Sequence, residues 1–196
     1  MGNCQTKKVS VETQTEYEPT IDDIKNIKCL DVNDFGIDFI GIKGYARVDL
    51  VYDGDTATLV FWYKSMSKFI RTRIRMAHYD TAEMKGTSAI EKSFAINAKI
   101  EFEKLVNFKE GSGRRIKKEN RYDSNSDIVW FEVIDMDTKW HRPIVMVWNT
   151  NNPKRNINAI IHEKWGVDYE GEHKSHDWNK ERITNISYDR PMSTSL

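Results

Sequence analysis

The chain has 196 residues, which suits one domain with a hydrophobic core and does not require a second domain. Its 30 Lys and Arg residues are balanced by 30 Asp and Glu residues, so any attraction to phosphate must come from a local patch. Cys4 and Cys29 lack metal-ligand spacing, and no apolar run has the length of a membrane span or secretory leader, so we expect an intracellular protein without a disulfide framework.

The distribution of hydrophobic residues divides the chain into three parts. Residues 1–40 and 181–196 are polar segments without sustained periodicity, so they are predicted to be flexible tails. Residues 41–180 are predicted to form the single domain.

Three strands are predicted in the first half of this domain. Residues 43–52 alternate between apolar and polar side chains, as a half-buried strand requires. Residues 56–63 are dense in β-branched and aromatic side chains. Residues 69–78 alternate again, and their polar face is rich in arginine and includes Arg75. Together these segments predict a three-stranded meander.

A helix is predicted from Ser88 to about Leu105. It opens with Ser88-Ala89-Ile90-Glu91, which matches a capping box, and apolar residues follow near helical spacing. The far end of this segment could also convert into a strand. A basic loop follows at residues 111–121.

Two more strands and a second helix complete the domain. Residues 128–134 and 144–148 have the composition of strands, and Asn156 opens a short helix that Gly166 closes. Five short strands with an intervening helix predict an α+β fold that is mainly β, an OB-type five-stranded barrel with helices.

Acidic residues gather where the predicted strands turn. The stretch Val51-Tyr52-Asp53-Gly54-Asp55-Thr56 contains an Asp-Gly pair that suits a type I′ turn, which does not explain Asp55. In a meander, the third strand ends on the same side of the sheet as this turn, and Asp80 and Glu83 follow that strand. We therefore expect Asp55, Asp80 and Glu83 to converge.

Such a cluster of acids predicts a cation. Three carboxylates about 5 Å apart would repel by roughly 3 kcal/mol per pair at an effective dielectric constant of about 20, and a bound divalent cation would reverse this. Ligands that are all oxygen favour Ca²⁺ or Mg²⁺ over zinc. The alternative is that the acids only solvate the ends of loops.

Arg75 favours a phosphate-binding interpretation of the same region. It lies five residues before Asp80 on the polar face of the third strand, beside the proposed metal. A cation, an arginine and a spare carboxylate can neutralise a phosphodiester and activate water against it. The alternative for Arg75 is an ordinary ion pair with a neighbouring acid.

Three motifs, taken together, resemble those of one known family. They are Asp53-Gly54-Asp55-Thr56, then Arg75 with Asp80-Thr81-Ala82-Glu83, then Lys139-Trp140-His141-Arg142-Pro143 before a strand. In this order, over about Tyr45 to Lys174, the chain resembles the staphylococcal nuclease (thermonuclease) family. The resemblance implies an OB-type barrel that hydrolyses phosphodiester bonds in DNA and RNA with Ca²⁺.

The resemblance also assigns roles by matching position. It implies that Asp55 and Asp80 are carboxylate ligands to Ca²⁺ and that the main-chain carbonyl of Thr81 adds a third oxygen. It implies that Glu83 is the general base that takes a proton from the attacking water.

Two arginines and a nucleotide pocket follow from the same resemblance. Arg75 and Arg142 would hold the phosphate and stabilise the charge that grows on it, with Arg142 nearer the leaving oxygen. Lys139, Trp140 and Tyr169 resemble, more loosely, residues that line the pocket for the nucleotide.

The chain departs from the family pattern at three places. Ala82 stands where the family usually has Pro, which loosens the loop but removes no chemical group. His141 stands where Gly is common and is bulkier beside Arg142. The basic segment Arg114–Arg121 is longer than the family minimum, and it either adds affinity for nucleic acid or is a solvated charge run.

The N-terminus matches a lipidation pattern. Gly2 and Thr6 fit N-myristoylation, Cys4 is placed for a second acyl chain, and Lys7-Lys8 suits anionic lipid. One acyl chain binds membranes only marginally, so the additional signals matter. We therefore expect membrane association.

Two other interpretations stay open. The barrel could be a catalytically silent module that binds nucleic acid or protein, although such copies typically lose the acids or arginines that this chain keeps. Zinc could bind His162, His173 and His176, although no Cys accompanies them. The favoured prediction is a monomeric, intracellular, membrane-tethered Ca²⁺-dependent nuclease that acts on DNA, with RNA as a second candidate substrate.

The lipidation prediction can be tested with Gly2→Ala. This change removes the acyl acceptor, so the protein should move from the membrane fraction to the soluble fraction of the host cell. Nuclease activity in vitro should not change, because Gly2 lies outside the predicted domain. An unchanged distribution between the fractions would contradict the anchor.

Overall fold

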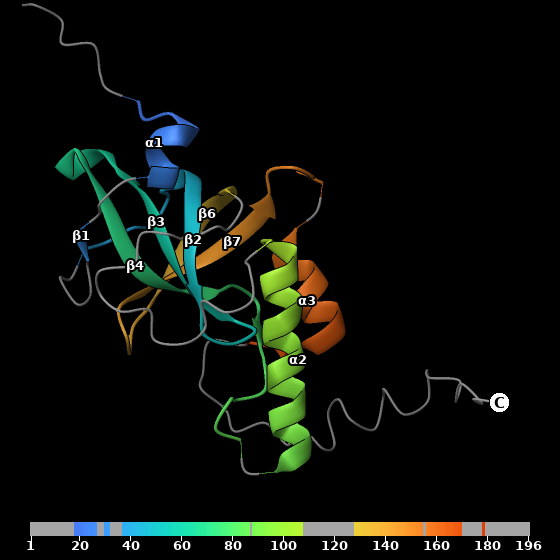
Figure 1. The fold of residues 1–196 in the computed structure, drawn as a ribbon. Coiled ribbons are helices and arrows are strands. Elements are labelled where there is room, and N and C mark those ends of the chain that lie inside the picture. Colours follow the sequence, from blue (N-terminus) through green and yellow to red (C-terminus); the bar gives the residue numbers. More distant parts are fainter. Residues whose placement is uncertain are drawn as a thin grey trace, which may run out of the picture.

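The computed structural model describes residues 18–26, 30–31, 37–86, 88–107, 128–154, 156–169 and Trp178. In this part of the chain the fold is mainly β, and five strands close into an OB-type barrel, as predicted from the sequence (Figure 1). The barrel strands are β2 (Lys43–Val51), β3 (Thr56–Tyr63), β4 (Lys68–Met76), β6 (Ile128–Asp137) and β7 (Arg142–Asn149).

The order of the strands brings distant segments together. Neighbouring strands run β4-β3-β2-β6-β7, and each of these pairs is antiparallel. A parallel pairing of β4 with β7, in which Arg75 faces Ile144 and Met76 faces Val145, closes the barrel. Closure therefore places Arg75 beside the start of the strand that begins at Arg142.

Two helices cover one end of the barrel. They are α2 (Ala89–Leu105) and α3 (Ile157–Trp165), which lie side by side (Figure 1). The hydroxyl of Ser88 caps α2 by accepting from the amide of Glu91, and the side-chain oxygen of Asn156 caps α3 by accepting from the amide of Ala159. The segment before Leu105 is helical throughout, so the alternative of a strand at its far end is wrong.

Short elements join these parts. A 3₁₀ turn, η1 (Lys64–Met66), connects β3 to β4. After β4, β5 (Tyr79–Asp80) pairs with β8 (Val167–Asp168), so the chain that carries Asp80 is tied to the segment after α3.

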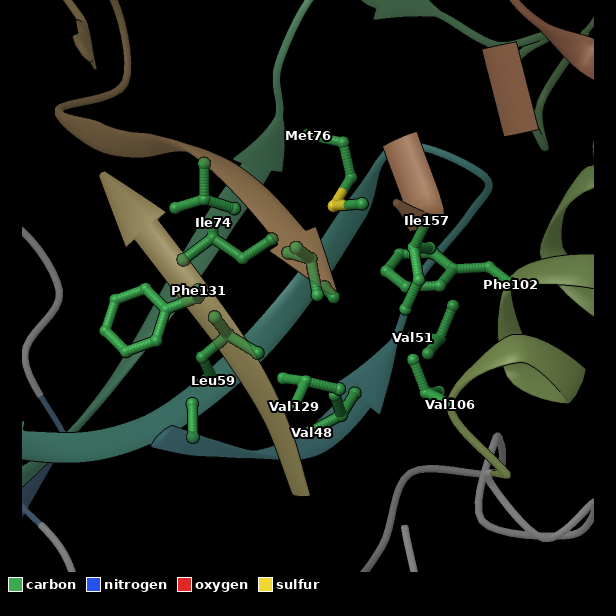
Figure 2. Packing of buried hydrophobic residues seen from close by; sticks show 14 of the residues in the cluster. Val48, Val51, Leu59, Ile74, Met76, Phe102, Val106, Val129, Phe131 and Ile157 are labelled. Atoms are coloured by element: carbon green, nitrogen blue, oxygen red, sulfur yellow. The ribbon is translucent and has the colours of Figure 1, made fainter. Parts of the chain in front are cut away.

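The hydrophobic core fills the barrel and extends under the helices. Figure 2 shows Phe102 of α2 and Ile157 of α3 pointing toward the barrel residues Val51 and Met76. These side chains are buried, so the helices are held by apolar contact with the end of the barrel.

The N-terminal segment contains structure that the sequence pattern did not predict. It forms α1 (Ile21–Asn26) and the short β1 (Leu30–Asp31), and β1 pairs in parallel with β4. Arg47 is fully buried and donates to the carbonyls of Ile24 (3.3 Å) and Lys25 (2.6 Å). Tertiary contacts therefore hold this segment, which has too few residues for a recognisable period.

The turn between β2 and β3 differs from the predicted type I′ turn. Among the described residues, positive φ angles occur elsewhere and not at Asp53 or Gly54. The amide of Tyr52 donates to the carbonyl of Thr56 (2.9 Å), which closes a wider loop. A Cβ atom on Gly54 would lie 2.7 Å from Ala98 Cβ and 2.7 Å from Thr81 Cγ2. Close approach, and not a positive φ, therefore requires glycine.

Gly54→Ala tests this reason for the glycine. The added methyl group would overlap Ala98 and Thr81, so the free energy of unfolding should fall by about 1–3 kcal/mol in urea titrations. A glycine kept only for loop freedom would give the opposite sign, because alanine would then stabilise the protein by about 0.4–1 kcal/mol.

Candidate active site

Asp55 is the centre of the acidic cluster. Its Oδ2 accepts from the amide of Thr81 (2.7 Å) and from the Thr81 hydroxyl (3.0 Å). Its Oδ1 accepts from the hydroxyl of Thr56 (2.9 Å) and from Nη1 of Arg75 (3.5 Å). Asp55 is only 6% exposed. The buried carboxylate therefore ties the β2–β3 turn to the loop that follows β5.

Arg75 joins the two predicted metal-binding carboxylates. Its guanidinium contacts Asp55 and also forms an ion pair with Asp80. The guanidinium also meets an aromatic ring, since its carbon lies 4.6 Å from the ring centre of Tyr169. The convergence predicted for Asp55 and Asp80 is therefore present, and Arg75 supplies the positive charge between them.

An open cleft of about 960 Å³ lies over this network. Of the residues predicted from the sequence, Asp55, Arg75, Glu83, Lys139, Trp140 and Arg142 line it. They come from the β2–β3 turn, β4, the loop after β5, the β6–β7 turn and the first residue of β7. The cleft also contains Tyr52, Asp53 and Arg73, to which the sequence assigned no functional role.

Two acids at this cleft, Asp53 and Glu83, have raised pKa values. Burial raises the pKa of Glu83 above its usual range, and the charge of Asp55 adds to the increase against the opposing effect of Arg75. Burial, followed by the charge of Asp55, raises the pKa of Asp53 to about 8. The amide of Asp55 donates to Asp53 Oδ1 (3.1 Å). Both shifts therefore reflect burial first and the negative charge of Asp55 second.

Asp137 organises the other wall of the cleft. Its Oδ2 accepts from Nη2 of Arg142 (2.8 Å), and its Oδ1 accepts from the amides of Lys139 (2.9 Å) and Trp140 (3.1 Å). Trp140 is 55% exposed, and Lys139 Nζ lies 5.3 Å from its ring centre. One carboxylate therefore orients both an arginine and an aromatic loop that face the cleft.

The donor set is compatible with Ca²⁺ in its chemistry. Asp55, Asp80 and the carbonyl of Thr81 offer only oxygen, which a hard cation prefers. The hydrogen bonds of Asp55 use the four acceptor sites of its carboxylate, so a cation would replace the weakest of them, the 3.5 Å contact from Arg75. Among the described residues, no group of three or more His, Cys, Asp or Glu side chains is arranged to hold a metal.

The two departures at the site have different structural contexts. His141 has a φ of 48°, which lies in the left-handed region that glycine adopts without strain. Ala82 is buried against Ala95 and Trp178, so tertiary packing holds the loop before Glu83.

Other predicted residues lie away from the cleft or outside the described residues. His162 Nε2 contacts Asp168 at 2.9 Å and its ring stacks on Tyr79. The remaining predictions fall outside the described residues, and they concern Gly2, Cys4, Thr6, Lys7-Lys8, the segment Arg114–Arg121, His173, His176 and the tail at 181–196.

Comparison with known proteins adds no family assignment. No protein-family model matches the chain, and no curated protein matches it at a significant level. Within the described residues, no helix combines the length and apolar character that crossing a membrane needs. The resemblance to the staphylococcal nuclease family therefore stays a prediction that rests on the three sequence motifs.

No role was assigned to Asp137 from the sequence, although the sequence contains a signal for its turn contacts. An Asp before a polar turn often accepts from backbone amides two residues on, as Asp137 does here. Tyr52 and Arg73 carried no comparable signal, because their proximity depends on strand register and on the path of the β2–β3 turn.

Asp137→Asn tests the role of this carboxylate in the structure. Burial alone would raise the pKa of Asp137, but the hydrogen bond from Arg142, the backbone amides and the charge of Arg142 outweigh it and lower the pKa. The variant keeps an acceptor and loses the charge, so at neutral pH its free energy of unfolding should fall by about 1–3 kcal/mol.

The pH dependence gives the matching control. Because the pKa is lower in the folded state, the stabilisation is complete above the unfolded value of about 3.9 and is lost as the pH falls through the folded pKa. The stability difference between wild type and Asp137→Asn should therefore narrow in acid. A difference that stays constant down to low pH would contradict this assignment.

Proposed function

We propose that this chain is a Ca²⁺-dependent phosphodiester hydrolase that cleaves DNA, with RNA as a second candidate substrate. The observation that carries the proposal is the meeting of Asp55, Arg75, Glu83 and Arg142 at one open cleft, from four separate parts of the chain. Two arginines suit a phosphate, and a carboxylate of raised pKa suits a base.

Glu83 is the proton acceptor in this proposal. A raised pKa makes a carboxylate a stronger base, and a general base works best when its pKa is near the working pH. Glu83 lies at the exposed part of the loop and lines the cleft, so water can reach it. It takes a proton from the water whose oxygen bonds to phosphorus. The bond from phosphorus to the leaving oxygen breaks, and that oxygen takes up a proton from solvent.

Arg75 and Arg142 stabilise the charge that develops on the phosphate oxygens. Arg75 is only 6% exposed and its orientation is fixed by two carboxylates and the ring of Tyr169. Arg142 is fixed by Asp137, and its buried Nε has no hydrogen-bond partner among the described residues. Donors held in place before the reaction stabilise a transition state with little reorganisation. Arg142 is placed nearer the leaving oxygen in this proposal.

Asp55, Asp80 and the carbonyl of Thr81 would hold Ca²⁺. When bound, Ca²⁺ neutralises part of the phosphate charge and makes water easier to deprotonate. The hydrogen bonds from Thr81 and Thr56 keep the Asp55 carboxylate oriented. None of these roles involves a 2′-hydroxyl, so the proposed mechanism does not itself exclude RNA.

The alternative is a barrel that binds nucleic acid without cleaving it. The same arginines would then bind phosphate, and Glu83 would have no chemical role. The two functions differ in one measurable respect, namely whether Glu83 and the metal change turnover or only binding.

Glu83→Gln separates the two functions. The amide keeps the size and hydrogen bonding of the side chain but cannot take a proton, so turnover of DNA should fall by about 10²–10⁴-fold while affinity stays nearly the same. The matched control is Glu163→Gln on the exposed part of α3, which should leave turnover unchanged.

Two further variants assign the other roles. Asp55→Asn should weaken Ca²⁺ binding in calorimetry, and part of its lost rate should return at higher Ca²⁺. Arg142→Ala should lower turnover by about 10²–10³-fold at every Ca²⁺ concentration, because it removes charge stabilisation at the phosphate. Thermal unfolding of each variant controls for misfolding. If wild type shows no chelator-sensitive cleavage and all three variants bind DNA as wild type does, the barrel is a binding module.

A further inference from the structure

Three arginines alternate along the outward face of β4, and they differ in their partners. Arg71 pairs with Asp49 at 2.5 Å, and Arg75 pairs with Asp55 and Asp80. Arg73 lies between them and is exposed. Within the described part of the chain, no carboxylate lies within ion-pair distance of Arg73. Its positive charge is therefore available to an anion from outside the molecule.

Tyr52 holds the guanidinium of Arg73 at the wall of the cleft. The guanidinium carbon lies 4.2 Å from the centre of the Tyr52 ring. Thr58, which faces Arg73 in the strand register, donates its hydroxyl to the Tyr52 hydroxyl at 3.4 Å. An arginine stacked on an aromatic ring loses less conformational freedom when it binds an anion, because it is already ordered.

The electrostatics of Tyr52 agree with this contact. Burial alone would raise its pKa, but hydrogen bonds from Thr58 and Arg73 and the charges of Arg73 and Arg71 outweigh burial and lower it. The phenol oxygen is therefore in a positive environment, which would also favour a phosphate.

The spacing of Arg73 and Arg75 matches a polymer of phosphates. Alternate residues of a strand lie roughly 6.6 Å apart on one face, since each residue advances about 3.3 Å. This is close to the separation of neighbouring phosphates along one nucleic-acid strand. Both arginines line the same cleft, so one strand that runs along β4 can meet both.

We propose that Arg73, held by Tyr52, binds the phosphate next to the scissile phosphate of a nucleic-acid strand. This inference rests on the proposed function for the choice of Arg75 as the scissile site. It adds a second binding subsite, which makes the protein prefer a chain of several nucleotides over a compound with a single phosphodiester bond.

The test compares Arg73→Gln with a matched loss of charge. Lys68→Gln is the control, because Lys68 is exposed at the start of the same strand and does not line the cleft. Binding of a fluorescent single-stranded oligonucleotide is measured in chelator over a salt series. Arg73→Gln should weaken binding about tenfold and lower the slope of log K against log salt by about 0.7, because one phosphate contact is lost. Lys68→Gln should change neither appreciably.

Cleavage in Ca²⁺ gives the second readout. For the oligonucleotide, Arg73→Gln should raise KM about tenfold with kcat nearly unchanged. Bis(4-nitrophenyl) phosphate has no neighbouring phosphate, so Arg73→Gln should cleave it with the same kinetics as wild type. Tyr52→Leu keeps the charge of Arg73 but removes the ring, so it should weaken oligonucleotide binding by about two- to fivefold.

The outcomes separate this inference from the proposed function. If wild type cleaves neither substrate but Arg73→Gln lowers the salt slope, the proposed hydrolase function is wrong and phosphate binding by Arg73 is supported. If wild type cleaves the oligonucleotide and Arg73→Gln matches Lys68→Gln in binding and KM, the hydrolase function is supported and phosphate binding by Arg73 is wrong. Equal losses on both substrates would also overturn it, because Arg73 would then act on the scissile phosphate itself. Failure of wild type to bind the oligonucleotide would overturn it as well.

Discussion

The carboxylate of Asp55 is the constraint on which the candidate site depends. It accepts hydrogen bonds from Thr56, at the start of β3, and from both donors of Thr81, in the loop after β5. These segments are distant in the chain and have no strand pairing between them in the described residues. The position of Glu83, two residues beyond Thr81, therefore follows from a hydrogen-bonded carboxylate and not from the sheet.

Closure of the barrel supplies the second part of the site. The parallel pairing of β4 with β7 brings Arg75 next to the strand that begins at Arg142. Arg75 then neutralises the acids that the turn and the loop bring together. Buried ion pairs contribute little net stability, because desolvation offsets much of their attraction. This ion-pair network is therefore weak evidence for stabilisation of the fold, and the proposed function gives it a use at the cleft.

The same face of β4 connects the site to the rest of the molecule. Arg71 pairs with Asp49, which pairs with the fully buried Arg47, and Arg47 donates to the carbonyls at the end of α1. The arginines of β4 thus have different partners at different positions along the strand. Arg71 is linked through Asp49 and Arg47 to α1, and Arg75 contacts the acidic cluster. Arg73 lies between these two arginines on the strand.

Much of the barrel could be predicted from the sequence, because alternation and capping are local properties. The bounds of β3 and the caps Ser88 and Asn156 follow from patterns a few residues long. The proximity of Asp55 to Asp80 could also be predicted, because the chain reverses direction at each turn of a meander and so returns to the same end of the sheet.

The features that could not be predicted depend on contacts between distant residues. α1 is six residues long and is held by Arg47, so its own sequence has too little period to reveal it. Gly54 is required by the approach of Ala98 from α2, which no local turn rule contains. The contact of Tyr52 with Arg73 needs the register of β3 and β4 together with the path of the turn.

The most direct test of the central claim is a cleavage assay of the wild-type protein on single-stranded and duplex DNA in Ca²⁺, in Mg²⁺ and in chelator. The account predicts cleavage in Ca²⁺ that chelator abolishes and that added Ca²⁺ restores, because the oxygen ligands and the acid cluster suit a hard divalent cation. Binding of DNA without cleavage in every condition, or cleavage that persists unchanged in chelator, would contradict it.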